Sequence, residues 1–167
     1  DFALKKVMAP ASDYDTETLA SVALNYQQRI GVDLLWITDE EGHLRADATE
    51  KLQSGRSVAS LSPLTEALRV GEAATAISEV NGILFQLVAV PVLGPDVIGF
   101  LLLGQEINNA LAQQLEEDTG SQVSFLTQTQ LFASSWSPLV QAQMFRHDRL
   151  PADLVQKPAQ EPFLLPL

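Results

Sequence analysis

Hydrophobic residues are concentrated in one long stretch near the middle of the chain, residues 82–104. Its length and apolarity approach those of a membrane-spanning helix. However, the Gly-Pro-Asp sequence at 94–96 is a turn signal, and Pro91 would interrupt a helix. The Val, Ile and Phe content on either side instead predicts two strands, 83–93 and 97–105. Because both are nearly continuous in apolar residues, each is expected to be a central strand of a sheet, covered on both faces.

A helical pattern precedes this stretch. Asp13 or Asp15 can cap the start of a helix, and Gly31 suits the left-handed residue that ends it. Residues 2–9 are expected to be the end of an earlier helix, which would stop before Pro10. The apolar stripe of the main helix consists of Leu19, Val22, Ala23, Tyr26 and Ile30. Residues 1–31 are therefore interpreted as an N-terminal helical segment that buries one face.

A hairpin is predicted after the helical segment. It has a strand over residues 32–39, a glycine-containing turn over 40–43 and a return strand over 44–47. The polar residues 48–62 are expected to form a loop over the sheet.

A short helix and a further strand lead back to the central pair. Ser62 is expected to cap this helix with Pro63 at its first position, and Gly71 to end it. A strand over 73–80 and an Asn-Gly hairpin turn then follow. This order predicts an α+β fold in which a long N-terminal helix packs on a central five-stranded antiparallel sheet, with residues 32–106 as the first module.

Residues 107–167 predict a second, smaller α+β module. Asn108 can cap a helix that runs to Thr119, with Gly120 as its terminator. The module is expected to be truncated, because the sequence stops where a strand could begin and the neighbours of that strand are missing. The later elements are strands over 122–127 and 130–134, a helix from Ser137 to about His147 and the start of a strand at 163–165.

Charge and composition narrow the choice of partners. The formal net charge is −11 over 167 residues, which disfavours binding to nucleic acid or to anionic membrane surfaces. Cationic or neutral partners fit better. The absence of cysteine excludes disulfides and thiol chemistry.

Catalytic and metal-binding motifs find little support. His43 and His147 are far apart and belong to no zinc-binding pattern, and the acidic run 39–41 lacks the ligand spacing of a calcium loop. We interpret His43 as a solvated turn residue, with ligand binding as the alternative. No enzymatic activity, cofactor or metal site is predicted for this chain.

Four segments together resemble the double Cache sensory domains of bacterial transmembrane signalling proteins. They are residues 1–9, 29–44, 86–92 and 117–126. The resemblance implies two PAS-like modules hanging from a long N-terminal helix, in the periplasmic part of an inner-membrane protein anchored by flanking spanning helices outside this fragment. It implies an output domain that is a diguanylate cyclase, a phosphodiesterase or a histidine kinase.

A sensor of this kind needs a few polar groups set in an apolar wall. If the faces of the two strands that carry them coincide, Trp36 supplies a flat wall and Gln86 a donor and an acceptor, and the neighbouring Phe85 belongs to the same candidate set. Arg45 and Arg56 are candidates for holding a ligand carboxylate. The alternative is that Trp36 is a core residue, Gln86 bonds to backbone and both arginines form surface ion pairs.

Two functions therefore remain open. One is a sensor that binds a small molecule and passes the signal through its N-terminal helix. The other is a ligand-free spacer that dimerises through the N-terminal helices. A sensor predicts a closed, partly polar pocket over Trp36 and Gln86, whereas a spacer predicts a solidly packed interior and a large apolar patch on the 16–30 helix.

Overall fold

The computed structural model describes residues 16–49, 54–127 and 130–144. The chain divides into two compact units, residues 1–106 (unit 1) and 107–167 (unit 2). The predictions for the earliest helix and for the last strand lie outside the described residues.

A five-stranded antiparallel sheet forms the centre of unit 1, as the sequence predicts. Its strands lie in the order β2-β1-β5-β4-β3, so the apolar stretch around the Gly-Pro-Asp turn does supply two interior strands. Gly82 and Asn81 adopt the positive φ angles of 80° and 52° that the tight hairpin before β4 requires. The strands are β1 (Leu34–Thr38), β2 (Leu44–Asp47), β3 (Ala74–Val80), β4 (Ile83–Leu93) and β5 (Val97–Glu106).

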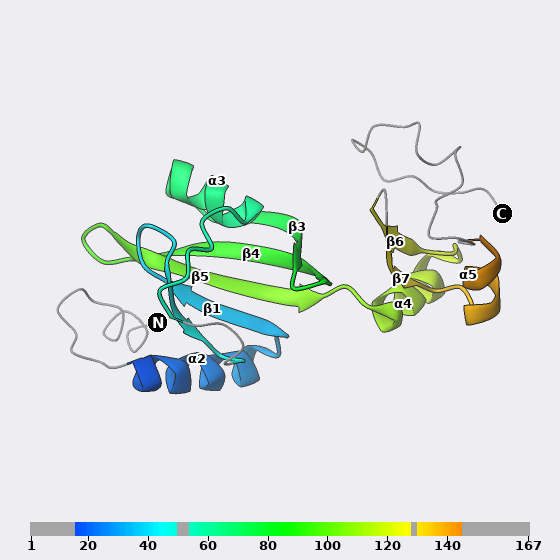
Figure 1. Ribbon diagram of the computed structural model, residues 1–167, viewed down its shortest axis with the longest axis horizontal. Coiled ribbons are helices and arrows are strands. Elements are labelled where there is room, and N and C mark those ends of the chain that lie inside the picture. The colour runs from blue at the N-terminus through cyan, green and yellow to red at the C-terminus, as the bar shows by residue number, and fades with distance from the viewer. Residues whose placement is uncertain (1–15, 50–53, 128–129, 145–167) are drawn as a thin grey trace. The chain divides into compact units, whose positions relative to one another are not determined.

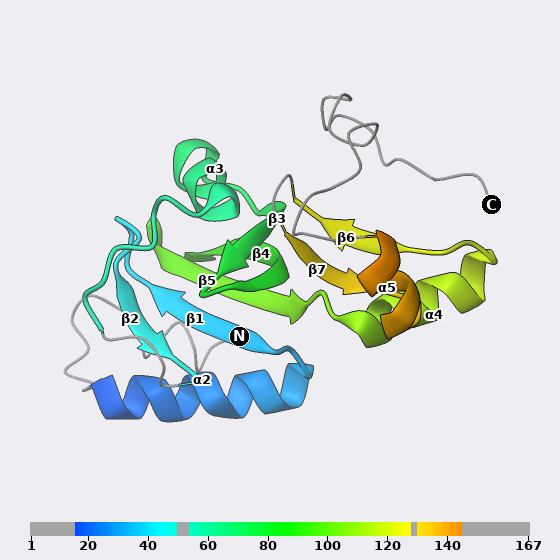
Figure 2. The same cartoon turned by 45° about the vertical axis from the view of Figure 1, so that its right-hand side comes forward.

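Two helices cover opposite faces of this sheet (Figures 1 and 2). Helix α2 (Thr16–Ile30) packs on β1 and β2, and helix α3 (Ser62–Val70) packs on β3 and β4. We call the two sides of the sheet the α2 face and the α3 face.

The burial of α2 follows the predicted stripe except at its end. Leu19 and Ala23 are buried, but Ile30 is 49% exposed. Ile30 stands in the last turn, next to Gly31, whose positive φ of 75° redirects the chain toward β1.

The start of α3 differs from the prediction by one residue. Leu61, with an extended backbone, occupies the N-cap position, no side chain caps the helix, and Ser62 is already helical. Pro63 has no backbone N–H, so the first turn of the helix has one donor fewer that needs a hydrogen-bond partner. Gly71 ends the helix in the left-handed conformation, as expected.

The two faces carry separate hydrophobic cores. On the α2 face, Leu35 and Ile37 of β1 belong to one cluster with Leu19 and Ala23 of α2. On the α3 face, the cluster combines strand residues with residues of α3 and of the loop before it: Leu34, Trp36, Leu44, Val58, Leu64, Ala67, Val80, Phe85, Leu87, Ala89, Phe100 and Leu102. Strand β1 therefore lies between two cores.

A β-bulge interrupts the pairing of β1 with β2. Ile37 pairs with Ala46, but Thr38 pairs with Leu44, so Arg45 is the extra residue on β2. The bulge explains why Leu44 and Ala46, two positions apart, belong to the α3-face and α2-face clusters respectively.

Unit 2 contains the predicted helix, hairpin and helix. Asn108 caps α4, its side chain accepting a hydrogen bond from the Leu111 backbone N–H, and Gly120 ends the helix as predicted. Strands β6 and β7 form a two-stranded sheet. The elements are α4 (Asn109–Thr119), β6 (Ser124–Leu126), β7 (Leu131–Ser134) and α5 (Pro138–Met144). Across the described residues of both units, no helix has the length and apolarity needed to cross a membrane.

Candidate functional site

Trp36 occupies the middle of β1 and is only 3% exposed. Its ring belongs to the α3-face cluster, yet its indole N–H has no hydrogen-bond partner among the residues that the structure describes. Leaving a buried donor unsatisfied costs about 1–3 kcal/mol. Buried polar groups are nearly always paired in native proteins, so this donor calls for an explanation.

Trp36 and Gln86 lie on opposite faces of the sheet. Trp36 pairs with Leu102, and Leu102 pairs with Ala89 on β4, so these three residues share the α3 face. Gln86 is three positions from Ala89 and therefore points to the α2 face. It is exposed. Trp36 and Gln86 could form one site only if their strand faces coincided, and they do not. Strand register, not apolar content, decides which residues share a face.

Phe85 is the other candidate that lies on the α3 face. It is 7% exposed and belongs to the same cluster as Trp36. Close by, a Cβ on Gly104 would approach a Leu87 methyl to 2.8 Å and the Phe85 ring to 3.3 Å. Leu87 and Phe85 can therefore pack as they do here because residue 104 is a glycine and has no side chain.

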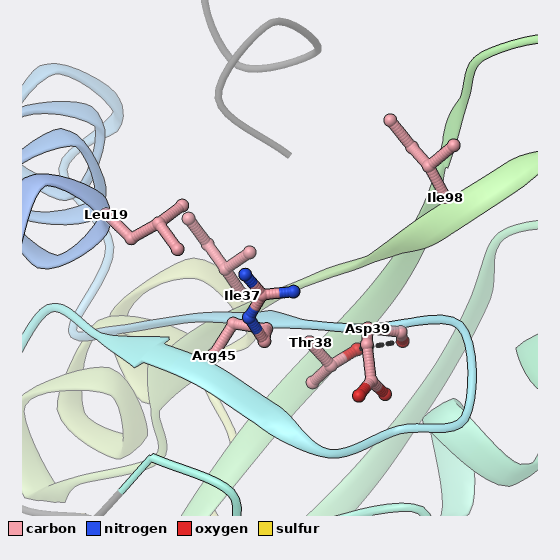
Figure 3. A pocket seen from close by; sticks show the side chains of 6 residues that line it. All are labelled: Leu19, Ile37, Thr38, Asp39, Arg45 and Ile98. Atoms are coloured by element: carbon pink, nitrogen blue, oxygen red, sulfur yellow. Dashed lines mark hydrogen bonds between the residues drawn. The ribbon is translucent and has the colours of Figure 1, made fainter. Parts of the chain in front are cut away.

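Arg45 lies on the α2 side, where the bulge places it. It lines a pocket of about 10 Å³ together with Leu19 of α2, Ile37 of β1, Thr38, Asp39 and Ile98. Figure 3 shows the Arg45 guanidinium next to Ile37. Such a volume holds about one water molecule, so as it stands it could not enclose an organic ligand.

Arg56 lies at the outer edge of the sheet. The backbone of residues 54–58 runs along β2, with the Leu44 N–H donating to the Arg56 carbonyl at 2.8 Å and the Val58 N–H to the Gly42 carbonyl at 2.9 Å. The Arg56 side chain is exposed. The five predicted site residues are thus divided: Trp36 and Phe85 share one core, while Arg45, Arg56 and Gln86 lie elsewhere.

The unsatisfied donor was missed by the sequence reasoning, which treated Trp36 only as an apolar wall. A signal existed, because a tryptophan in a fully buried strand carries an N–H that usually finds a partner. Which atom stays unpaired depends on the neighbours of the ring, and these come from α3 and from distant strands.

Comparison with known proteins agrees with this architecture. Residues 9–155 match the family described as "Double sensory domain of two-component sensor kinase". No curated protein matched. The fold resembles that of the sensor domain of the V. cholerae histidine kinase DctB, with a TM-score of 0.57 and 14% identity over 81% of this chain and 58% of that chain.

The fold also resembles that of the E. coli DcuS sensor domain, with a TM-score of 0.53 and 18% identity over 69% of this chain and 91% of that one. Identities this low establish a shared fold and nothing finer. The family match covers most of the chain, names sensor kinases and gives no support to a diguanylate cyclase or phosphodiesterase output. The chain belongs to the double Cache family of sensory domains of two-component sensor kinases.

Proposed function

We propose that this chain is the extracytoplasmic ligand-sensing domain of a membrane-bound sensor kinase, and that unit 1 binds a small molecule on its α3 face. The observation that carries the proposal is the buried indole N–H of Trp36, which has no partner among the described residues. A ligand oxygen that accepts this hydrogen bond would satisfy the donor and so avoid the cost of leaving it unpaired.

The chemical class of the ligand follows from the donor and its surroundings. An N–H in an aromatic and aliphatic wall selects a small molecule with an accepting oxygen, such as a carboxylate or a carbonyl, next to an apolar part. Arg45, Arg56 and Gln86, which lie away from Trp36, are not part of this proposed site.

The position of β1 suggests how occupancy would be transmitted. Trp36 faces the proposed ligand, and the adjacent Leu35 and Ile37 pack in the same cluster as Leu19 and Ala23 of α2. A shift of β1 on binding would therefore act on α2, the helix that we propose passes the signal toward the membrane segments.

Of the two features expected of a spacer, the packed interior is present around Trp36, but the large apolar patch on α2 is not. Leu24 and Ile30 are the large apolar residues of α2 that are most exposed, at 41% and 49%. At 3.6 residues per turn they are about 120° apart around the helix. They do not form the continuous stripe that pairing of two α2 helices would require.

A thermal-shift screen of organic acids, amino acids and related compounds against the purified chain tests the proposal. Binding at a hundredfold excess over Kd stabilises the folded state by about 2.7 kcal/mol, a shift of several degrees. A hit should be lost in Trp36→Phe, which keeps an aromatic ring but removes the N–H. It should persist in Phe85→Leu, which reduces a side chain of the same face without removing a donor.

Three other outcomes have distinct meanings. A hit that survives Trp36→Phe places the ligand away from this donor, and a hit lost only in Gln86→Ala places it on the α2 face. Silence across a broad library would favour the spacer.

A further inference from the structure

The turn between β1 and β2 gathers three side chains that can ligate a metal. The ligand atoms of Asp39, Glu41 and His43 all lie within 4.8 Å of one another. His43 Nδ1 is 3.3 Å from Asp39 Oδ2 and 3.7 Å from Glu41 Oε2. An imidazole nitrogen thus faces two carboxylates from the same turn.

The backbone holds two of these groups in place. Asp39 Oδ1 accepts hydrogen bonds from the Glu41 N–H at 3.1 Å and the His43 N–H at 2.8 Å, and the Asp39 N–H donates to the His43 carbonyl at 2.9 Å. Gly42 has a positive φ of 84°, and a Cβ there would lie 2.9 Å from the Ala59 Cβ. The turn is therefore tightly packed, and Asp39 Oδ2 is directed to the His43 ring.

No lysine or arginine among the described residues forms an ion pair with Asp39 or Glu41, although Arg45 lines a pocket together with Asp39. The ionic contact of these two carboxylates is with His43. The whole chain carries a net charge of −11. Two carboxylates near one another repel, and a bound divalent cation would relieve that repulsion.

We propose that Asp39, Glu41 and His43 form a site for a divalent transition-metal ion of the Zn²⁺ type, separate from the proposed organic-ligand face. Ligand bonds of about 2.0–2.2 Å place neighbouring ligand atoms roughly 3–3.6 Å apart. The His43 to Asp39 distance already fits. Glu41, whose side chain is 69% exposed, closes the remaining gap, and water completes the coordination.

The donor set determines the metal class. Imidazole nitrogen suits zinc, copper and nickel, whereas Mg²⁺ and Ca²⁺ favour sites built of oxygen alone. His43 would bind through Nδ1, in the tautomer that carries its proton on Nε2.

Isothermal titration of the 167-residue chain with ZnCl₂ and, in parallel, MgCl₂ tests this site. We expect one zinc ion to bind and Mg²⁺ to bind far more weakly. Glu41→Gln and His43→Asn should each weaken zinc binding by about tenfold or more. Glu40→Gln is the matched control, because it removes the same charge from the same turn and should leave zinc affinity nearly unchanged.

Each remaining outcome overturns the site. Absence of zinc binding does so directly. Binding that is unchanged in Glu41→Gln and His43→Asn places the metal elsewhere in the chain. Equal weakening in Glu40→Gln shows a diffuse attraction of cations to an acidic surface. A melting curve measured for each variant separates loss of ligation from loss of folding.

Discussion

The carboxylate of Asp33 accepts a hydrogen bond from the backbone N–H of Glu106 at 2.8 Å. The same oxygen accepts one from the Gln105 side chain. The contact joins the residue before β1 to the last residue of β5, immediately before the boundary with unit 2. It therefore ties together the ends of β1 and β5, the paired strands that position Trp36.

Replacing Asp33 by Ala should lower the free energy of unfolding by about 1 kcal/mol, because hydrogen bonds to a charged acceptor are lost at an exposed position. Chemical denaturation measures the change. Glu106→Gln is the control, since only the backbone of Glu106 takes part in this contact. An equal loss in both variants would contradict the assignment.

Leu87→Ala should destabilise unit 1 by about 2–5 kcal/mol, because Leu87 is fully buried in the α3-face core. Val90→Ala, on the same strand but facing the α2 side and only half-buried, should cost about 1 kcal/mol or less. Urea unfolding of the two variants checks the difference. Similar losses would mean that the two faces of β4 are equally covered.

Gly104→Ala should cost about 1–3 kcal/mol, because the new methyl group would overlap Leu87 and Leu34 at 2.8 and 3.0 Å. Gly94→Ala, in the exposed β4–β5 turn, would place its methyl group 3.2 Å from the Ile98 Cγ2 and 3.7 Å from the Asp96 carbonyl oxygen, and should be milder. The melting temperatures of both variants, measured together, decide. A Gly104→Ala protein as stable as the parent would show that this part of the core can expand.

Stability should depend weakly on pH through Glu66. The hydrogen bond from Arg69, and then its positive charge, lower the pKa of Glu66 from its ordinary value of 4.5. The folded state therefore binds this proton less tightly than the unfolded chain does, so its contribution is present above pH 4.5 and is lost as the pH falls below it.

The effect should be small because both side chains are exposed. Glu66→Gln should leave the melting temperature at pH 7 nearly unchanged and slightly reduce its fall between pH 5 and pH 3. Glu72→Gln, an exposed neighbour in the chain outside this pair, is the control. A large drop at pH 7 in Glu66→Gln would contradict the proposed weakness of the pair.

Local signals in the sequence were sufficient for most of the fold. The Asn81-Gly82 turn, the Gly71 and Gly120 terminators and the Asn108 cap each depend on a few adjacent residues, and each appears where it was predicted. The cap of α3 differs by one residue from the prediction, because serine is a preferred N-cap residue type whereas the helix begins after Leu61, without a side-chain cap.

The site depends on non-local geometry, which explains why it was predicted less well. Whether Trp36 and Gln86 share a face is decided by the register of β1 on β5 and of β5 on β4, and the β1–β5 pairing joins residues far apart in the sequence, such as Trp36 and Leu102. A one-residue change in register reverses a face. The meeting of Asp39 and His43 is local, but the packing of Gly42 on Ala59 that fixes their turn is not.

The bulge at Arg45 gives β2 an unusual tolerance to shortening. Loss of one residue from a regular strand normally inverts every side chain that follows it. Here Thr38 already pairs with Leu44 and Ile37 with Ala46, so a chain lacking Arg45 would pair these same residues without interruption. Leu44 would still face the α3-face core and Ala46 the α2-face core. The β1–β2 hairpin could therefore lose this residue and keep both cores intact.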